Sequence, residues 1–259
     1  MDTNRGDCAH TVEGSALDAT ASDNCGVTSL KNDFNNDYTL HGAVFPIGGT
    51  KVEWTARDAA GNTRKCTYTV VVVDDDDPEV QVCPSDIVQA NDPNVCGAQI
   101  DYDVLFKDNC DGLNRTGDLI EGYYSGAVFP VGVTTVVWRY VDHASNDFAE
   151  CLFTVTVNDE QNPVIYCPSN IRVNIGGSVS GGVGGWPAAN PHIVGSGPCG
   201  VTLAYTAPVG EDNCPNPLTI LQSGLGSGPN YYEYGGIYTE TYNVIDASGN
   251  VASCSFTIE

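Results

Sequence analysis

The sequence has few positive charges and no long apolar segment. Lys and Arg number 10 against 33 Asp and Glu, which gives a formal net charge of -23. Such a chain repels phosphate backbones, so nucleic-acid binding is disfavoured. No stretch approaches the roughly 18 apolar residues of a membrane span, and the N-terminus lacks the apolar core of an export signal. We therefore expect no nucleic-acid partner and no membrane span.

The motifs of common enzymes are also missing. The four histidines are isolated, and the sequence has no His-Glu-x-x-His, no Gly-x-Ser-x-Gly and no phosphate-binding glycine loop. The abundant carboxylates leave an accidental acid pair as the one open route to catalysis. We predict that the protein is not an enzyme.

Cysteine is abundant, yet no Cys-x-x-Cys pair occurs. Its absence argues against a zinc ribbon or a thioredoxin-type centre. With 11 cysteines in 259 residues, disulfides are the default interpretation, and they place the protein in an oxidising compartment, extracellular or on the cell surface. Together with the missing export signal, this composition suggests a piece of a longer protein.

An internal repeat organises the chain. The tripeptide Asp-Asn-Cys occurs at Asp23–Cys25, Asp108–Cys110 and Asp212–Cys214, and a later cysteine follows at 41, 41 and 40 positions. Between these landmarks "VFPIG" at 44–48 matches "VFPVG" at 128–132. The turn-forming clusters "DAAGN", "DHASN" and "DASGN" begin at residues 58, 142 and 246. This regularity predicts three copies of one structural unit.

Strand-like alternation flanks each of these turns. Val52, Trp54 and Ala56 alternate with more polar residues before the first turn, and Cys66, Tyr68, Val70 and Val72 do so after it. The second copy repeats the pattern, and we find no comparable helical periodicity. Short strands with frequent Gly, Pro and Asn turns favour antiparallel β-sandwiches. The predicted fold is all-β.

The third copy contains an insertion. It falls in the Gly/Ser-rich segment 176–198, which reads as a long exposed loop or a glycine-rich hairpin. A tolerated surface insertion is the plain interpretation. An aromatic anchor on a loop is instead typical of an interface. The candidate ligand-contacting residues are Trp186 in this segment and Tyr231, Tyr232 and Tyr234 in the tyrosine-rich segment 230–238.

These landmarks together resemble the hyalin repeat, an immunoglobulin-like β-sandwich module of extracellular and cell-surface proteins. The second copy carries the resemblance in "VCPSDI", "VCGAQIDY", "KDNCDG", "VFPVG" and "CLFTVTVND", and the third in "YCPSNI", "PCGVTLAY" and "DASGNVASCSFTI". The third copy departs from it with "YGGI" at 234–237 in place of "FPxG". The resemblance implies three tandem sandwiches end to end. We expect residues 1–76 as a repeat lacking its opening Cys-Pro strand, 77–160 as a complete repeat, and 161–259 as a repeat with the insertion.

A full repeat of this kind has four cysteines, which allow three connectivities. We predict that the outer two pair and the middle two pair within each repeat. The predicted outer pairs are Cys83–Cys151 and Cys167–Cys254, and the predicted middle pairs are Cys8–Cys25, Cys96–Cys110 and Cys199–Cys214.

Cys66 is then left unpaired. One explanation is that the chain is a fragment of a longer array. The other is that a neighbouring subunit supplies the missing strand and thiol, which would also cover the sheet edge that the first repeat exposes.

Acidic residues gather where one repeat passes into the next. Four aspartates precede Pro78, and "NDEQNP" precedes Val164, an arrangement similar to the acidic, Pro-terminated linkers of cadherins. Adjacent carboxylates repel one another unless a cation neutralises them, and calcium takes six to eight oxygen ligands. A hydrated spacer extended by its own charge is the alternative. The candidate ligands are Asp74, Asp75, Asp76, Asp77, Asp159, Glu160 and Asn162 in the linkers, with Asp58, Asp108 and Asn109 from loops.

We therefore predict a structural and adhesive segment of an extracellular fibre, stalk or filament, stiffened by disulfides and calcium. Its partners would be neighbouring copies of itself or flanking repeats of the same protein. The alternative is a module that binds a glycan or protein ligand through the loops of the third repeat.

Overall fold

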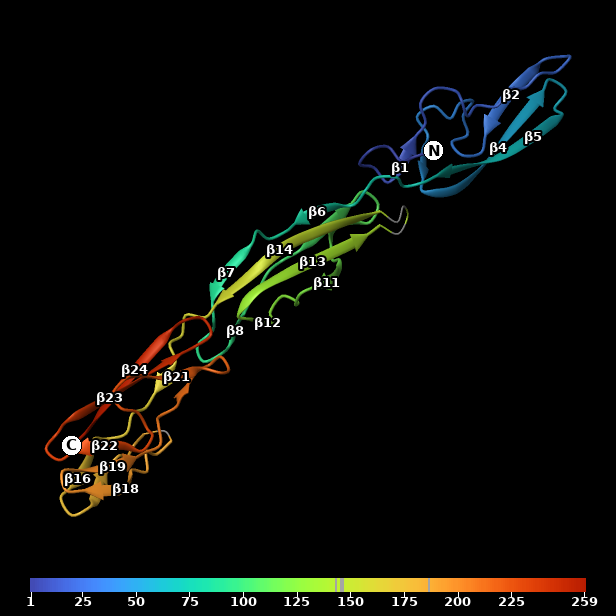
Figure 1. Ribbon diagram of the computed structural model, residues 1–259. Helices are drawn as coiled ribbons and strands as arrows, with labels where there is room; N and C mark the ends of the chain where they lie inside the picture. The colour runs from blue at the N-terminus through green and yellow to red at the C-terminus, as the bar shows by residue number, and fades with distance from the viewer. Residues whose placement is uncertain (143, 145–146, 186) are drawn as a thin grey trace. The chain divides into compact units, whose positions relative to one another are not determined.

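The computed structural model describes residues 1–142, 144, 147–185 and 187–259. Every regular element in these residues is a β-strand, as the sequence predicts (Figure 1). The described residues contain no helix that is long and apolar enough to cross a bilayer.

The chain divides into two compact units. Unit 1 comprises Met1–Ser85, Tyr102–Tyr124 and Thr135–Phe153, and unit 2 comprises Asp86–Asp101, Ser125–Thr134 and Thr154–Glu259. The division passes through the second predicted repeat, so that the three boundaries expected from the sequence stay a prediction. Each unit is described by itself.

Unit 1 contains the strands of the first repeat and part of the second. They are β1 (Ala9–Thr11), β2 (Val27–Asn32), β3 (Val44–Pro46), β4 (Gly48–Asp58), β5 (Thr63–Val72), β6 (Glu79–Val82), β9 (Leu105–Asp108), β10 (Gly112–Arg115), β11 (Asp118–Glu121) and the unit 1 parts of β13 (Gly132–Val141) and β14 (Phe148–Asn158).

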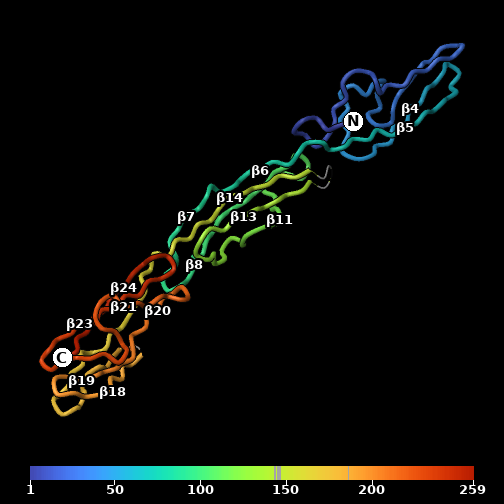
Figure 2. The backbone as a smooth tube through the Cα atoms, viewed as in Figure 1, coloured from blue at the N-terminus to red at the C-terminus, as the bar shows by residue number. Residues whose placement is uncertain are grey.

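The longest pairing in the first repeat is the hairpin of β4 and β5. It runs from Arg57 opposite Thr63 to Gly48 opposite Val72, and the two strands lie side by side in Figure 2. The "DAAGN" cluster closes it, because the Asp58 carboxylate accepts hydrogen bonds from the backbone N–H and the side-chain amide of Asn62. The predicted turn is therefore confirmed, with the aspartate as its acceptor.

Two sheets pack against each other around the core of the first repeat. One is the pair β1–β3, which contributes Phe45, and the other has the order β2–β4–β5 and contributes alternate residues of its two long strands. Val52, Trp54, Val70 and Val72 are buried, whereas Cys66 at the far end of β5 is exposed. The alternation therefore holds along most of the hairpin and fails near the turn.

Aromatic residues of the second repeat that lie in unit 1 contact one another. Tyr102 packs edge-on against Phe153 with 5.0 Å between ring centroids, and the Trp138 indole N–H donates to the Tyr102 hydroxyl at 3.1 Å. The first repeat has the same type of contact, because the Trp54 indole N–H donates to the Tyr68 hydroxyl at 3.3 Å. The indole N–H thus keeps a hydrogen-bond acceptor in both repeats, whether the tryptophan is buried, as Trp54 is, or half-buried, as Trp138 is.

Unit 2 contains the remaining strands. They are β7 (Ile87–Ala90), β8 (Gly97–Gln99), β12 (Val128–Pro130), β15 (Val164–Ile165), β16 (Ile171–Asn174), β17 (Ser178–Gly181), β18 (His192–Gly197), β19 (Gly200–Ala204), β20 (Gly210–Glu211), β21 (Leu218–Ser223), β22 (Asn230–Glu233), β23 (Tyr238–Ile245), β24 (Val251–Ile258) and the unit 2 parts of β13 and β14.

The third repeat is also a two-sheet sandwich. Its sheets have the orders β17–β16–β24–β23–β21 and β18–β19–β22, and both contribute to one buried cluster. Tyr242 takes the position of the tryptophans, and its hydroxyl lies 2.8 Å from that of Tyr205. Burial, together with this contact and the nearby Glu240, raises the pKa of Tyr205 far above its ordinary value, so the hydroxyl pair is neutral.

The glycine-rich insertion extends both sheets of the third repeat. Its first part forms β17, which pairs with β16, and its last part forms β18, which pairs with β19. The insertion is thus neither one long loop nor a hairpin closed on itself. Trp186 lies outside the described residues.

Truncation of one buried ring provides a test of the core. Phe153 is 1% exposed, whereas the adjacent Leu152 points away from the core and is 64% exposed. We predict that Phe153→Ala lowers the free energy of unfolding by about 3–5 kcal/mol because it leaves a cavity. Leu152→Ala is the matched control and should change it by less than about 0.5 kcal/mol. Denaturant unfolding of both variants measures the difference, and equal losses would contradict the assigned strand faces.

Candidate metal centre at two equivalent linkers

Two acidic linkers follow the last strands of the first and second repeats. Linker 1 is the segment 74–78, after β5, and linker 2 is the segment 159–163, after β14. Each begins with a tight local turn, in which the carboxylate of the first aspartate accepts the backbone N–H two residues later. The pairs are Asp74 with Asp76 at 3.3 Å and Asp159 with Gln161 at 3.2 Å. The two linkers therefore start with the same backbone shape.

The Asp-Asn-Cys tripeptides form a second type of turn. In each described copy the aspartate accepts the N–H of its own cysteine, at 2.9 Å for Cys110, 2.8 Å for Cys214 and 2.7 Å for Cys25. Short polar side chains favour such turns because they satisfy the backbone locally. We call these segments DNC turns.

Disulfides join DNC turns to the preceding repeat. Cys110 is bonded to Cys8 and Cys214 is bonded to Cys96, each with Cα atoms 4.7 Å apart. The first bond lies wholly within unit 1 and the second wholly within unit 2. Each crosslink brings the DNC turn of one repeat to the linker that follows the previous repeat.

The predicted pairing of the middle cysteines is therefore wrong. The pairs Cys8–Cys25, Cys96–Cys110 and Cys199–Cys214 are replaced by bonds that are shifted by one repeat. The physical reason is the periodicity itself. A cysteine of one repeat has the same chemical partner in its own repeat and in the next, and only the fold decides which of the two lies within bonding distance.

The outer pairs agree with the prediction. Cys83 is bonded to Cys151 and Cys167 to Cys254, with Cα separations of 5.6 and 5.5 Å. Cys25, Cys66 and Cys199 are free and exposed thiols. Cys66 thus stands as expected, while Cys25 and Cys199 depart from the pairs predicted for them.

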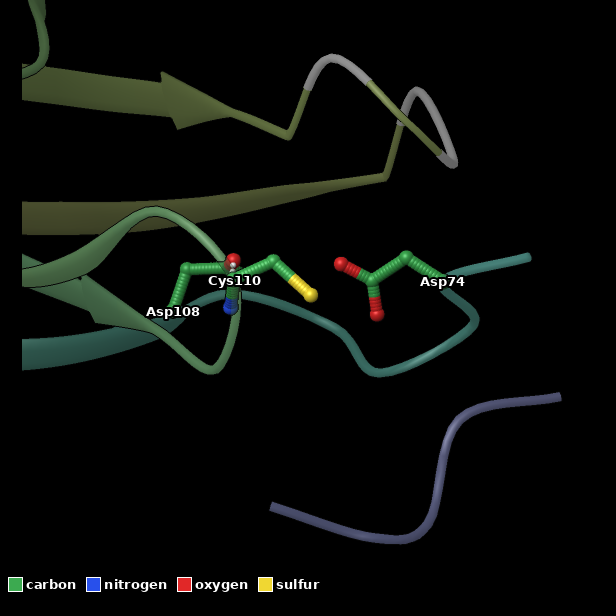
Figure 3. A group of neighbouring side chains, drawn as sticks. All are labelled: Asp74, Asp108 and Cys110. Atoms are coloured by element: carbon green, nitrogen blue, oxygen red, sulfur yellow. Dashed lines mark hydrogen bonds between the residues drawn. The ribbon is translucent and has the colours of Figure 1, made fainter. Parts of the chain in front are cut away.

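Linker 1 and its DNC turn enclose three oxygen atoms that have no hydrogen-bond donor among the described residues. They are Asp74 Oδ2, Asp108 Oδ2 and Asn109 Oδ1. Asp74 is 5% exposed and Asp108 is 7% exposed, and each brings a carboxylate oxygen within 4.8 Å of the other. Figure 3 shows the Asp74 carboxylate directed toward the turn that carries Asp108 and Cys110. Buried carboxylate oxygens without donors are costly unless a cation compensates them.

Linker 2 repeats this arrangement residue for residue. Asp159 Oδ2, Asp212 Oδ1 and Asn213 Oδ1 are the oxygens without a donor in the described part of the chain, and Asp159 is 7% exposed. Carboxylate oxygens of Asp159 and Asp212 again lie within 4.8 Å of each other. The same uncompensated oxygen set at both linkers indicates a shared role.

The sulfur atoms near these oxygens are not metal ligands. Cys110 and Cys214 lie within the same distance of the carboxylates, but both are in disulfides. A disulfide sulfur carries no thiolate charge, and metals such as zinc bind the thiolate. The donor set is therefore oxygen only, which suits a hard cation.

The comparison with protein families matches the HYR domain over residues 8–72 and 73–157. The chain belongs to the HYR domain family. Between these two matches, the boundary falls four residues before the predicted one at 76/77.

Among the curated relatives are two sea urchin proteins called hyalin. That of Strongylocentrotus purpuratus is 30% identical over 247 residues, which cover 92% of this chain and 18% of hyalin. That of Lytechinus variegatus is 30% identical over 155 residues, which cover 59% of this chain and 28% of hyalin. The chain thus spans under a third of either relative.

Two solved structures resemble the chain weakly. They are mouse cadherin-23 EC22–24, with a TM-score of 0.34 and 12% identity over 97% of this chain and 93% of that one, and Drosophila N-cadherin EC1–3, with a TM-score of 0.32 and 12% identity over 96% and 93%. Scores this low support no structural argument, so the fold rests on the strand pairing described above.

The other aspartates of linker 1 face a polar cavity. Asp75, Asp76 and Asp77 line a space of about 840 Å³ together with Arg5 and Lys107. Asp75 and Asp77 are exposed, and Asp76 accepts the Gly6 N–H at 2.8 Å. Desolvation, followed by repulsion from neighbouring aspartates, raises the pKa of Asp75. In linker 2 the predicted ligands Glu160 and Asn162 are exposed. These five predicted ligands are therefore weaker candidates for binding a cation than the buried oxygen atoms that have no hydrogen-bond donor.

Asp58 does not lie at linker 1, where it was predicted to contribute a ligand oxygen. Its carboxylate closes its own turn with Asn62 instead of joining linker 1. The side-chain hydrogen bond from Asn62 outweighs desolvation and lowers the pKa of Asp58. The third repeat explains the error, because there the corresponding turn contacts the linker before its repeat.

That contact involves Asn250 in the turn Asp246–Asn250. Its side-chain amide donates to the backbone carbonyls of Asp159 at 3.0 Å and Gln161 at 3.4 Å, and to the Asp246 carboxylate at 2.7 Å. Burial acts to raise the pKa of Asp246, but the hydrogen bonds from Asn250, Ser248 and Gly249 outweigh it and the net shift is downward. The turn therefore holds linker 2 by its backbone.

Only some of the tyrosines predicted to contact a ligand are exposed to solvent. Tyr232 is 3% exposed and its hydroxyl donates to buried Glu240, so the prediction that it contacts a ligand is wrong. Tyr231 is 48% exposed and Tyr234 is half-buried. In β22 alternate side chains face opposite sides, which separates Tyr231 from Tyr232.

Sequence reasoning missed Asp212 and Asn213. Both lie in the third copy of the tripeptide whose second copy supplied Asp108 and Asn109 as candidates. Carrying the assignment across the repeat would have identified them.

Asn250 provides a test of the contact with linker 2. Asn62 makes the same hydrogen bonds within its own turn and serves as the matched control. We predict that Asn250→Ala lowers the free energy of unfolding by about 1–2 kcal/mol more than Asn62→Ala does, because two further hydrogen bonds are lost. Denaturant unfolding measures the difference.

The same variant should also change the acid response. The lowered pKa of Asp246 stabilises the fold above the ordinary aspartate pKa, and this contribution is lost as the pH falls through the folded-state pKa. We expect Asn250→Ala to raise the pKa of Asp246 in an NMR titration. An unchanged pKa would contradict the assigned hydrogen bonds.

Proposed function

We propose that this chain is a non-catalytic structural and adhesive segment of an extracellular or cell-surface fibre, stalk or filament. Calcium and a disulfide would together fix each joint between its HYR repeats. The observation that supports this most is the pair of equivalent, buried oxygen sets beside the two crosslinks between repeats. The four disulfides fit an oxidising extracellular compartment.

The histidines support a role without catalysis. His10, His41 and His192 each have a ring nitrogen within hydrogen-bond distance of a backbone group. The metal-type clusters found among the described residues contain only aspartates and disulfide-bonded cysteines. Such carboxylate clusters suit cation binding better than nucleophilic chemistry.

The charges at the joint favour a divalent cation. At a separation of about 5 Å and an effective dielectric constant of about 20, two like charges repel by roughly 3 kcal/mol. Asp74 and Asp159 lie in the linkers, whereas Asp108 and Asp212 lie in the DNC turns of the repeats that follow them. Without a cation this repulsion would push neighbouring repeats apart, and with one it becomes attraction through a shared ion.

Calcium fits the donor set. It accepts carboxylate and amide oxygens in flexible geometry, and it completes its coordination with backbone carbonyls and water. Each joint supplies two carboxylates and one amide oxygen. At the first joint, the carboxylates of Asp111 and Asp142 also lie within 4.8 Å of that of Asp108 and are further candidates. Magnesium demands stricter octahedral geometry and fits less well.

Calcium titration tests this proposal. We predict one binding event for each joint in isothermal titration calorimetry, with Asp74→Asn abolishing the first and Asp159→Asn the second. Exposed Asp103 provides the control Asp103→Asn, which should bind like the wild type. At a calcium concentration of 100 times Kd, each site should stabilise the folded state by about 2.7 kcal/mol.

The contradicting outcome is equally specific. The proposal that calcium binds at these joints is contradicted if the thermal midpoint of unfolding is the same in calcium and in EDTA. It is also contradicted if Asp103→Asn weakens calcium binding as much as Asp74→Asn does.

Strand complementation would be a second means of assembly. Among the described residues β5 is an edge strand of the first repeat, and only its end is covered, by Met1 to Thr3 running parallel to Val71–Val73. The counterparts of β5 in the second and third repeats each have a parallel neighbour. Strand β14 pairs with β7, and β24 pairs with β16. Their cysteines Cys151 and Cys254 are in disulfides, whereas Cys66 is free.

A synthetic peptide tests this edge. We predict that a peptide with the sequence of residues 82–91, which contains the Cys-Pro strand, forms a disulfide with Cys66 under a glutathione redox buffer. A scrambled peptide of the same composition is the control, and equal labelling by both would contradict a strand-specific edge.

The alternative function is recognition of a glycan or protein by the third repeat. It depends on Tyr231, whose ring is half exposed, and on Tyr234. An amphipathic aromatic side chain on a surface is typical of binding sites. Specific binding in a glycan array that is lost in Tyr231→Ala would favour it over a purely structural role.

A further inference from the structure

The two crosslinked joints are built from the same pair of parts. One part is the DNC turn. The other is the residue pair that ends in the cysteine bonded to it, Asp7-Cys8 or Val95-Cys96, which we call the acceptor loop. The asparagine of the DNC turn donates to the carbonyl that precedes this cysteine, from Asn109 to Asp7 at 3.2 Å and from Asn213 to Val95 at 3.1 Å. A disulfide and an adjacent hydrogen bond therefore define the joint.

A third contact recurs at each joint. The residue two positions before the acceptor cysteine donates its backbone N–H to the linker, from Gly6 to Asp76 at 2.8 Å and from Asn94 to Gln161 at 2.7 Å. All three contacts occur at both joints, although the residues before the acceptor cysteine differ, with Arg5-Gly6-Asp7 at one and Pro93-Asn94-Val95 at the other. The joint is therefore a recurring recognition unit of the repeat.

The first repeat carries a DNC turn that has no acceptor loop among the described residues. Asp23-Asn24-Cys25 is folded like its counterparts, with the Cys25 N–H bonded to the Asp23 carboxylate at 2.7 Å. All three residues are exposed, whereas Asp108 and Cys214 are buried where a repeat covers them. The Cys25 thiol is free.

The third repeat carries the complementary part. Pro198-Cys199 is the sequence counterpart of Asp7-Cys8 and Val95-Cys96, and it forms the two-residue connection between β18 and β19. Both residues are exposed and the Cys199 thiol is free. The carbonyl of Cys199 is used by the Tyr234 N–H at 3.0 Å, which fixes the connection against β22.

We propose that Cys25 and Cys199 are the two halves of a further joint, through which the third repeat of one copy binds the first repeat of a second copy. This rests on the proposed structural function. Asn24 donates its side-chain amide to the Pro198 carbonyl, and the two sulfurs bond. The copies then continue head to tail through the same type of disulfide and asparagine hydrogen bond that connects repeats within one copy.

The bond requires an oxidant. Two thiols lose two protons and two electrons to become one disulfide, and a small disulfide such as oxidised glutathione accepts them and leaves as two reduced thiols. Exchange proceeds through a mixed disulfide between glutathione and one cysteine. The thiolate of the other copy then attacks the sulfur of this cysteine and releases reduced glutathione.

Cys66 distinguishes specific pairing from general thiol reactivity. Like the other two, it is free and exposed. Its counterparts Cys151 and Cys254, however, pair within their own repeats and not across a joint. The joint model therefore assigns it no role in head-to-tail bonding.

The test is oxidation of the purified chain in a glutathione buffer with calcium, followed by non-reducing electrophoresis and peptide mapping. We expect a ladder of multimers whose predominant link joins Cys25 to Cys199. Cys25→Ser and Cys199→Ser should each lose this link and the ladder. Mixing the two variants should restore a dimer that carries the link once, and Cys66→Ser should leave the ladder unchanged.

Two results would overturn the proposal. One is a random set of links in which Cys25–Cys25 or Cys66 bonds are as abundant as Cys25–Cys199. The other is a protein that stays monomeric under conditions in which the Cys8–Cys110 bond forms. Calcium titration of the monomer is a separate readout, so failure of the head-to-tail link would be distinguishable from failure of the proposed metal sites.

Discussion

The disulfides between neighbouring repeats are the constraint on which the rest of the structure depends. Cys8–Cys110 closes 102 residues and Cys96–Cys214 closes 118. In the chain-entropy description, crosslinks over loops of this length destabilise the unfolded ensemble by about 4–5 kcal/mol each. Their structural effect is more specific, because each one places a DNC turn against the acidic linker of the preceding repeat.

This placement creates an electrostatic conflict that a cation would resolve. Asp74 and Asp108, like Asp159 and Asp212, are brought together by the fold, and none of the four has a cationic partner in an ion pair described by the structure. In a typical sandwich domain, each module is stabilised by its own core and the joints are left flexible. Here the joints contain a covalent bond and buried carboxylates, so the free energy of the array depends on its connections as well as on its cores.

Much of the fold was predictable because it depends on local pattern. The alternation of Val52 and Trp54, the "DAAGN" turn and the pairs Cys83–Cys151 and Cys167–Cys254 all lie within single repeats. The middle disulfides were not predictable, because a periodic sequence does not distinguish a partner in the same repeat from one in the next. Asp58 was misassigned for the same reason: the turn of a repeat faces the linker before it, and this direction is a property of the three-dimensional arrangement.

The most direct test of the joint is the disulfide map of the unreduced protein. Proteolysis without reduction, followed by mass spectrometry, should yield peptides that link Cys8 to Cys110 and Cys96 to Cys214. Peptides that link Cys8 to Cys25 and Cys96 to Cys110 would contradict the account, because every contact proposed at the joints depends on the pairing between repeats.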